Sequence, residues 1–507
     1  MSLQKRFRSR FKRDFFDIKI VPGLFLLVLT PLLLQAQKLI TIEEALKIAE
    51  TNSPQIRTTY LNLVQSQKML EAQRASYKSK FSFNVTPIQY NKSRSFEKSL
   101  NSWMTYEETR SGGQFQVIQP VLLTDGTISL VNDFGWLKSY SQNDYQDSLQ
   151  KSFSNNLYLS INQPLFTYNQ RKLELRKLEL DYENSNLSYA IQRLGMEKSV
   201  SQFFFNIYLA QMSVSIAKDE LTNTEKNFEI IKNKVEAGLA RKEELFQAEL
   251  NLASARSALK NKEVNLENSK DEFKYYVGMN LSEDFSVLTD LTVNTVQVDI
   301  NKSIEQALSR RLEIRQREIS YEKTQFELVR TKSINEFKGN LELSIGIMGD
   351  NPQLADIYTK PTNSPKVALS FEIPIWDWGQ RKASIEAQEA SIQVEQINVE
   401  QEKKQIEIDV RKVYRNLQNQ LDQIEIARTN QRNAELTYEI NLERYKNGDL
   451  TGMDLNLYQN QLSQKKMDLS QALINYKLEL LNLKIQTLYD FEKNESIVPE
   501  QYINQTR

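Results

Sequence analysis

Two stretches of this chain share one pattern: NLYLSINQPLFTYNQRK at residues 156–172 and KVALSFEIPIWDWGQRK at residues 366–382. In each, apolar and polar residues alternate, as in a β-strand, up to a proline, Pro164 or Pro374. Two aromatic residues follow, and a charged helical pattern begins at Gln-Arg-Lys. The two copies stay 210 residues apart at every matching position, so we interpret the chain as internally duplicated.

Long helical patterns follow each copy. The only glycines between Lys172 and Gly278 are Gly195 and Gly238, and no proline occurs from residue 165 to 351. Helices of about 65 and 38 residues, ~100 Å and ~55 Å long, fit this stretch, with Gly238 as the break. Their apolar residues recur every seven positions, which predicts coiled-coil packing. The stripes are Leu245, Leu252, Leu259, Leu266 and Phe273; Leu455, Leu462, Leu469, Tyr476 and Leu483; and Ile385, Ile392, Val399, Ile406 and Val413.

The residues before each copy are also repeated. PQIR at 54–57 corresponds to LEIR at 312–315, an offset of 258 residues. Strand-like alternation follows in both halves, at Phe81, Phe83 and Val85 and at Leu341, Leu343 and Ile345. The first half therefore holds 48 more residues between its two strands than the second. This region, 88–155, is rich in Ser, Asn, Gly and aromatic residues, and we expect a long loop that carries one hairpin.

Composition narrows the functional classes. The chain has no cysteine and no histidine, which excludes disulfides, a thiol nucleophile, a histidine base and the commonest transition-metal ligand. We predict a protein that is not an enzyme and that has no catalytic, cofactor-binding or metal site. Without the first 36 residues, acidic residues exceed basic ones by five, and nothing indicates binding to nucleic acid.

Residues 1–36 have a basic start, a short apolar run and a small residue, Ala36, before Gln37, which predicts a signal peptide. We expect a first structural repeat at 37–300 and a second at 301–489, followed by a polar C-terminal tail at 490–507. The first contains the loop 88–155, a helical hairpin at 172–278 and a connector at 279–300. The second contains a helical hairpin at 380–488.

No later stretch resembles a transmembrane helix, so a membrane location would require a closed β-barrel. Two strands per half give four per chain, whereas a small barrel needs about eight. The chain would therefore assemble with copies of itself in cyclic symmetry. Apolar residues on alternate strand positions would face lipid. Four aromatic residues stand where the strands would leave the bilayer, as membrane-interface aromatics do: Phe166, Tyr168, Trp376 and Trp378.

The duplicated unit, with the helix breaks Val235-Glu-Ala-Gly238 and Tyr445-Lys-Asn-Gly448, closely resembles the TolC-like outer-membrane efflux family. The resemblance covers the chain from about Leu39 to Leu488. It implies a mainly α fold with a β-barrel portion, in which a homotrimer gives four strands per protomer to a twelve-stranded transmembrane barrel. A coiled-coil α-helical barrel continues it through the periplasm of a Gram-negative bacterium. The loop 88–155 would face outside.

The resemblance also implies partners. The tips of the helical hairpins would meet the hairpins of a periplasmic membrane-fusion adaptor, which connects the tunnel to an inner-membrane pump. The protein would then be the outer-membrane exit duct of a tripartite efflux or secretion system. The implied adaptor-contacting residues are Gly238, Leu239 and Glu244 on the first tip, and Gly448 and Asp449 on the second.

In this family the second hairpin closes the tunnel like an iris, partly through rings of acidic side chains. Asp454 matches the position of one ring, six residues past Gly448. The usual second acid is Leu457 here, and a basic residue common in the family is Leu450. The resemblance therefore implies a periplasmic gate at these three residues that is more apolar than usual. As an alternative to this role, Asp454 suits the first turn of a helix, where the dipole favours a carboxylate.

The main alternative is a coiled-coil scaffold of the cell envelope without channel activity. Heptads alone would fit it, but the alternating strands with aromatic ends would then have no purpose. An outer-membrane hydrolase is a weaker alternative, because no nucleophile and base converge in the sequence.

Overall fold

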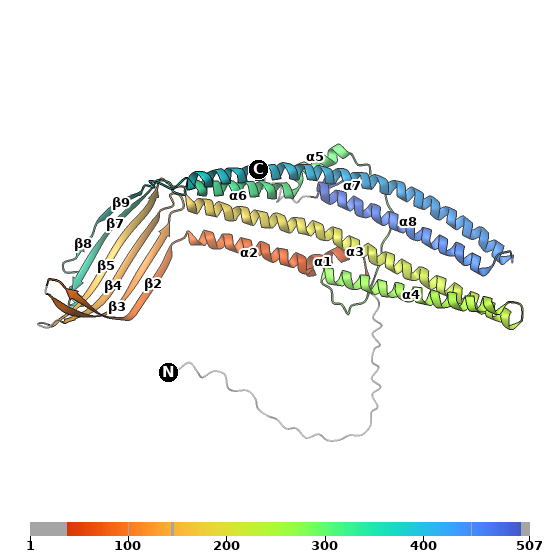
Figure 1. Cartoon of the computed structure of the whole chain (residues 1–507), viewed down its shortest axis with the longest axis horizontal. Helices are drawn as coiled ribbons and strands as arrows, with labels where there is room; N and C mark the ends of the chain where they lie inside the picture. Colours follow the sequence, from red (N-terminus) through yellow and green to blue (C-terminus); the bar gives the residue numbers. More distant parts are fainter. Residues whose placement is uncertain (1–37, 100, 143–146, 448, 498–507) are drawn as a thin grey trace, which may run out of the picture.

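The structure is a computed structural model of the chain, and it describes residues 38–497 except 100, 143–146 and 448. The expected signal peptide, Gly448 and residues 498–507 of the expected tail lie outside the described residues. A β-sheet forms one end of the molecule, and long helices run from it to two tips at the other end (Figure 1).

The helices are α1 (Ile42–Asn52), α2 (Pro54–Ser76), α3 (Gln170–Glu236), α4 (Lys242–Val277), α5 (Ile300–Arg310), α6 (Leu312–Lys332), α7 (Gln380–Lys446) and α8 (Gly452–Thr487). The strands of the large sheet are β2 (Lys80–Glu97), β3 (Ser102–Pro120), β4 (Thr127–Gln142), β5 (Asp147–Leu165), β7 (Lys338–Asn351), β8 (Thr362–Asn363) and β9 (Lys366–Glu372). Short pairs are β1 (Lys38–Ile40) with β6 (Phe285–Val287), and β10 (Tyr489–Asp490) with β11 (Glu495–Ser496).

The repeated helices have matching lengths. α3 and α7 each contain 67 residues, and α4 and α8 each contain 36. α3 starts where the Asn169 side chain accepts a hydrogen bond from the Lys172 amide at 2.8 Å. The first hairpin turns at Gly238, whose φ of +73° lies in the left-handed region that glycine adopts without strain.

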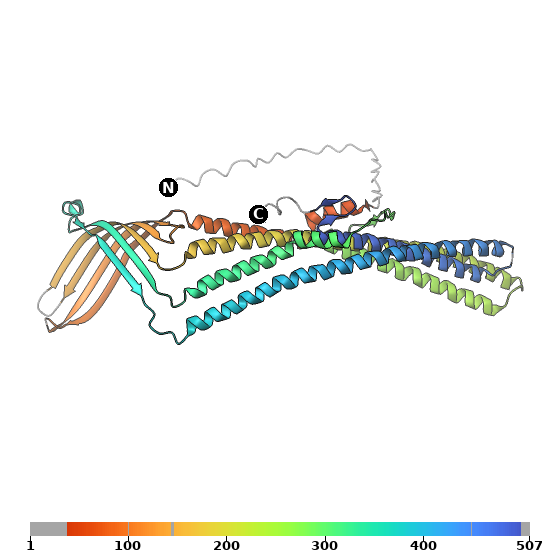
Figure 2. The ribbon, with the colours of Figure 1, turned by 90° about the horizontal axis from the view of Figure 1, so that it is seen from above.

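The helices lie side by side in one curved layer (Figure 2). Near the sheet the order across the layer is α2, α3, α6 and α7, and near the tips it is α4, α3, α8 and α7. The expected heptad stripes lie on the faces between neighbouring helices. Ile406, Tyr476 and Leu483, for example, are buried there.

In the middle of the molecule, two short helices pack on the long ones. α1 packs against α3 and α4, and α5 packs against α7 and α8. Phe204, Phe273 and Phe285 are fully buried in a cluster that ties α3, α4 and β6 together. No helix within the described ranges combines the length and the apolar composition needed to cross a lipid bilayer.

Residues directly after α8, including the first of the expected polar tail, pack against the helices. Tyr489 and Phe491 are buried against α7 and α8, and Ile497 packs against the cluster that contains Leu488. β10 and β11 form a small antiparallel pair there. The expected tail from residue 490 therefore includes residues that close the core, because the aromatic side chains cover the end of α8.

The sheet contradicts two of our expectations. The region 88–155 is not a long loop, because β2, β3, β4 and β5 run through it and pair in that order. The sheet then continues through β7, which pairs with both β8 and β9 along one edge. Ser364 also donates its amide to the Gly346 carbonyl at 2.8 Å, so β8 and β9 occupy a single strand position interrupted at Pro365. The protomer thus has six strand positions, and the prediction of four is wrong.

The two faces of the sheet differ in polarity. In register across the strands, Phe81 pairs with Val117, Val117 with Leu130, Leu130 with Leu159, and Leu159 with Ile345. A row on the opposite face contains Asn84, Gln114, Asp133, Asn156 and Met348. Since strand residues alternate between faces, one face of the sheet is apolar and the other is largely polar. The apolar face is exposed: Phe81, Leu159 and Ile345 are 71%, 43% and 67% accessible.

Candidate functional site

The predicted interface aromatics all lie where strands become helices. Phe166 has a φ of +60° and packs on Phe337 and Phe371, with ring centroids 5.4 and 6.4 Å away. Trp376 and Trp378 meet edge to face at 5.7 Å, and Trp378 is 90% exposed. An exposed aromatic cluster at the end of an amphipathic sheet has the chemistry of a membrane–water boundary.

The first tip exposes an apolar side chain. After Gly238, the Leu239 amide donates to the Lys234 carbonyl at 2.7 Å, and the Leu239 side chain is 79% exposed. Glu244 lies in the first turn of α4, where its carboxylate is 3.7 Å from the Arg241 guanidinium.

At the second tip, Thr451 caps α8 and Asp454 lies in the first turn of this helix. The Thr451 hydroxyl donates to the Asp454 carboxylate at 2.6 Å and accepts from the Asp454 amide at 3.2 Å. Asp454 and Leu457 are exposed, Leu450 is half-buried, and the Asp449 amide donates to the Arg444 carbonyl. The predicted gate residues therefore lie close together along the chain, Leu450 just before α8 and Asp454 and Leu457 in its first two turns.

Near the tips, the two hairpins are joined by amide hydrogen bonds that our sequence reasoning missed. Asn223 donates to Gln459 at 2.7 Å, Asn227 donates to the Gly452 carbonyl at 3.2 Å, and Asn460 donates to Glu220 at 3.2 Å. A Cβ at Gly452 would collide with the side chain of Asn227. The signal available in the sequence was the glycine itself, because glycine is the residue that allows another group to approach the backbone closely.

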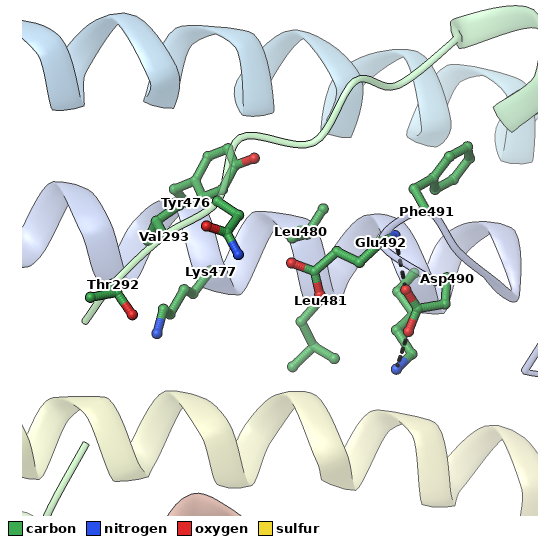
Figure 3. A pocket seen from close by; sticks show the side chains of 11 residues that line it. Thr292, Val293, Tyr476, Lys477, Leu480, Leu481, Asp490, Phe491 and Glu492 are labelled. Carbon is green, nitrogen blue, oxygen red and sulfur yellow. Dashed lines mark hydrogen bonds and ion pairs between the residues drawn. The ribbon is translucent and has the colours of Figure 1, made fainter. Parts of the chain in front are cut away.

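A cavity of about 330 Å³ lies between α8, the connector and the C-terminal residues (Figure 3). Its walls include Lys477 and Leu480 of α8, Thr292 of the connector and Asp490, which forms an ion pair with Lys484 at 3.0 Å. Burial lowers the pKa of Lys477, whose ammonium donates to the Asp290 carbonyl. These contacts tie the connector and the C-terminal residues to α8. No group of three or more potential metal ligands occurs among the residues that the structure describes.

The open edges of the helical layer expose apolar residues whose repeat counterparts are buried. Ile319 of α6 is 1% exposed and packs in one cluster with Leu187 of α3, which is 5% exposed. The counterpart of Ile319, 258 residues earlier, is Leu61 on the α2 edge; that of Leu187, 210 residues later, is Ile397 on the α7 edge. Leu61 and Ile397 are each 56% exposed. The two edges are therefore complementary to each other.

The chain matches the family model described as outer membrane efflux protein over residues 127–278 and 303–485. No curated protein sequence matches it significantly. Among solved structures, the outer membrane channel CmeC of Campylobacter jejuni has a TM-score of 0.68 at 14% identity, covering 92% of this chain and 88% of CmeC. The open state of the MtrE outer membrane channel of Neisseria gonorrhoeae has a TM-score of 0.63 at 16% identity, with 89% of each chain covered. The outer membrane protein VceC of Vibrio cholerae has a TM-score of 0.61 at 13% identity, covering 89% of this chain and 95% of VceC.

Proposed function

Because the chain belongs to the outer membrane efflux protein family, we propose that three copies form the exit duct of a tripartite efflux or secretion system. The sheets of the three copies would close into a barrel in the outer membrane of a Gram-negative bacterium. The helices would extend from it as a tunnel through the periplasm. The family is one of transport proteins, and the proposed duct performs no chemistry.

The complementary edges of the helical layer carry this proposal. Within the protomer, α6 packs on α3 through Ile319 and Leu187. The same contact between copies would bring Leu61 of one protomer onto Ile397 of the next. Both side chains would then leave water, and complete burial of each would stabilise the contact by roughly 1.5–3 kcal/mol. Since each copy carries both edges, repetition of the contact generates a ring when the rotations between copies sum to a full turn.

The apolar face of the sheet supports the membrane location. Its rows run across every strand from β2 to β7, and its exposed aromatic cluster lies at the helical boundary. A soluble scaffold would leave this face in water, where an apolar patch of this size favours aggregation.

We place adaptor contacts at the tips, around Leu239 and Asp449, because these apolar and acidic residues are exposed at the end of the wall farthest from the sheet. The gate would be formed where Asp454, Leu457 and Leu450 of three copies converge. The amide hydrogen bonds from Asn223 and Asn227 would hold the second hairpin against the first in the closed state. Neutral amides do not titrate, so this latch would be insensitive to pH near neutrality.

The trimer is tested by cysteine cross-linking, since the chain has no native cysteine. The double variant Leu61→Cys/Ile397→Cys is expressed in full-length protein, and outer membranes are oxidised before denaturing electrophoresis. We expect covalent dimers and trimers. Each single variant is the matched control and should remain monomeric after denaturation. A soluble rod that shows no covalent oligomers would contradict the exit duct and favour the scaffold.

The gate is tested separately with Asn223→Cys/Gln459→Cys, which joins the two hairpins of one protomer. Oxidation should hold the reconstituted trimer in its low-conductance state in planar bilayers, and reduction should restore openings. Conductance that does not respond to the redox state would contradict this latch while leaving the trimer intact.

A further inference from the structure

The sheet contains a hairpin that the second half of the chain lacks. β3 and β4 lie between β2 and β5, whereas the equivalent strands of the second half, β7 and β9, pair directly. The 48 additional residues of the first half are therefore a pair of sheet strands (Figure 1).

This hairpin has the same two-faced character as the rest of the sheet. On the apolar face it contributes Phe115 and Val117 from β3 and Ile128 and Leu130 from β4, in register with Leu159 of β5 and its neighbours. The alternate residues, such as Gln114, Gln116 and Ser129, lie on the opposite face. A hairpin outside the bilayer would have no reason to continue the apolar rows of the strands on both sides of it.

The hairpin also preserves the strand directions that are needed to join the sheets of neighbouring copies. Adding two antiparallel strands leaves β2 and β9 antiparallel to each other, so β9 of one copy can pair with β2 of the next. The β5–β7 pairs Leu159–Ile345 and Ile161–Leu343 predict the register of this junction. With the repeat offsets of 210 and 258 residues, Leu369 would face Pro87, and Phe371 would face Val85. Leu369, Phe371 and Val85 are exposed in the single chain, at 54%, 49% and 58%.

Geometry favours six strands beneath four helices. At a spacing of about 4.8 Å and a tilt of about 40°, each strand takes up ~6 Å of barrel circumference, so six strands take up ~38 Å. Four helices packed about 8–10 Å apart take up ~32–40 Å. Four strands would cover only ~25 Å and would narrow the duct at the membrane.

We propose that the β3–β4 hairpin is part of the membrane wall and widens the exit, so that the trimer closes with eighteen strands rather than twelve. This rests on the proposed trimer. The barrel is then about as wide as the helical tunnel, and cargo that fits the tunnel meets no second constriction in the membrane. At equal tilt, the barrel circumference is about 1.5-fold that of a twelve-stranded barrel.

The position of the hairpin is tested by spin labelling of full-length protein in phosphatidylcholine vesicles. Val117→Cys and Leu130→Cys should show the high oxygen and low nickel-chelate accessibility of a lipid-facing site, like the control Leu159→Cys on β5. Gln116→Cys and Ser129→Cys should show the reverse. Uniform water accessibility at all four hairpin sites would overturn the proposal, because the hairpin would then lie outside the bilayer or inside the lumen.

The width is tested by deleting residues 99–146, which should let β2 pair directly with β5, with Phe81 opposite Leu159. Ser160→Cys, on the polar face of β5, is labelled from outside intact cells with maleimide-polyethylene glycols of increasing mass. We expect a larger size limit in the full chain than in the deletion variant. Equal limits would overturn the wider exit, and if the deletion variant does not assemble, the spin labels still decide the position of the hairpin.

Cross-linking of Leu61→Cys to Ile397→Cys separates this inference from the trimer, since the cross-link requires no particular number of strands.

Discussion

The two halves of the chain have kept the lengths of three helix pairs equal, with α2 and α6 differing by two residues, and have let their strands diverge. α3 and α7 are equal in length, as are α4 and α8, and α1 and α5. The sheet, by contrast, receives four strands from the first half and two strand positions from the second. The physical constraints on the two regions explain the difference. Helices of one wall must reach the same level at both ends, whereas a sheet accepts any additional hairpin that preserves antiparallel alternation and the apolar face.

The largest effect should come from making the helical hairpins unequal. Removing one heptad from each arm of the first hairpin, residues 225–231 and 249–255, would pull its tip back by ~10 Å. We expect loss of heat-modifiable trimers on electrophoresis of outer membranes. The matched control also removes residues 435–441 and 459–465 from the second hairpin and should recover trimers. Equal trimer yields from both variants would contradict the requirement for level tips.

Two heptad-stripe residues that correspond in the repeat should differ in the stability lost on substitution, because they differ in burial. Tyr476 is fully buried and its hydroxyl accepts a hydrogen bond from the Val296 amide at 3.1 Å, whereas its counterpart Leu266 is only partly buried. Tyr476→Ala should cost about 3–5 kcal/mol and Leu266→Ala about 2 kcal/mol. Tyr476→Phe should cost about 1 kcal/mol, because it removes only the hydrogen bond. Thermal unfolding of the three variants in detergent, followed by circular dichroism, would measure these losses of stability. Equal losses for Tyr476→Ala and Leu266→Ala would show that the two halves are packed alike.

A smaller contrast separates Arg315 from its repeat counterpart Arg57. Arg315 is 17% exposed in the middle of the wall and lies 2.7 Å from Glu183 and 2.8 Å from Glu322, and the hydrogen bond with Glu183 raises its pKa. Arg57 is exposed at the α2 edge. Arg315→Gln should therefore cost about 1–2 kcal/mol, and Arg57→Gln less than about 0.5 kcal/mol. A larger loss for Arg57→Gln in the assembled trimer would reveal an ionic contact with the neighbouring copy.

The smallest expected effect distinguishes the two strand–helix junctions by pH. Asp377 accepts hydrogen bonds from the amides of Arg381 and Gly379, and these bonds lower its pKa, whereas α3 begins at the neutral Asn169. Because the folded-state pKa is lowered, the stabilisation is present above the usual carboxyl pKa of about 3.9 and is lost as pH falls through the lowered value. Acidification should therefore change the fluorescence of Trp376 and Trp378. The change should be absent in Asp377→Asn, and its persistence there would assign it to another group.

The strands of the first half show why the sheet was only partly predictable. β3 and β4 contain Gly112, Gly113 and Gly135 and five Ser residues, a composition that is typical of loops. Their apolar alternation, at Phe115 and Val117, is short, because only one face of the sheet is apolar and the other is largely polar. The same difficulty applies to Asn223 and Asn227 near the tips, since an amide on a helix surface gives no indication of its partner.

The sequence by itself determined the duplication, the helical hairpins with their break at Gly238, and the stripes on which the helices pack. These are properties of local period and of residues with special backbone preferences, and both can be read within one segment. Only the tertiary structure decided that β3 and β4 enter the sheet between β2 and β5, that residues after Leu488 close the core, and that Gly452 admits the side chain of Asn227. Each of these depends on the choice of a neighbour distant in the chain. A strand pattern specifies which face is buried but does not specify which strand will lie beside it.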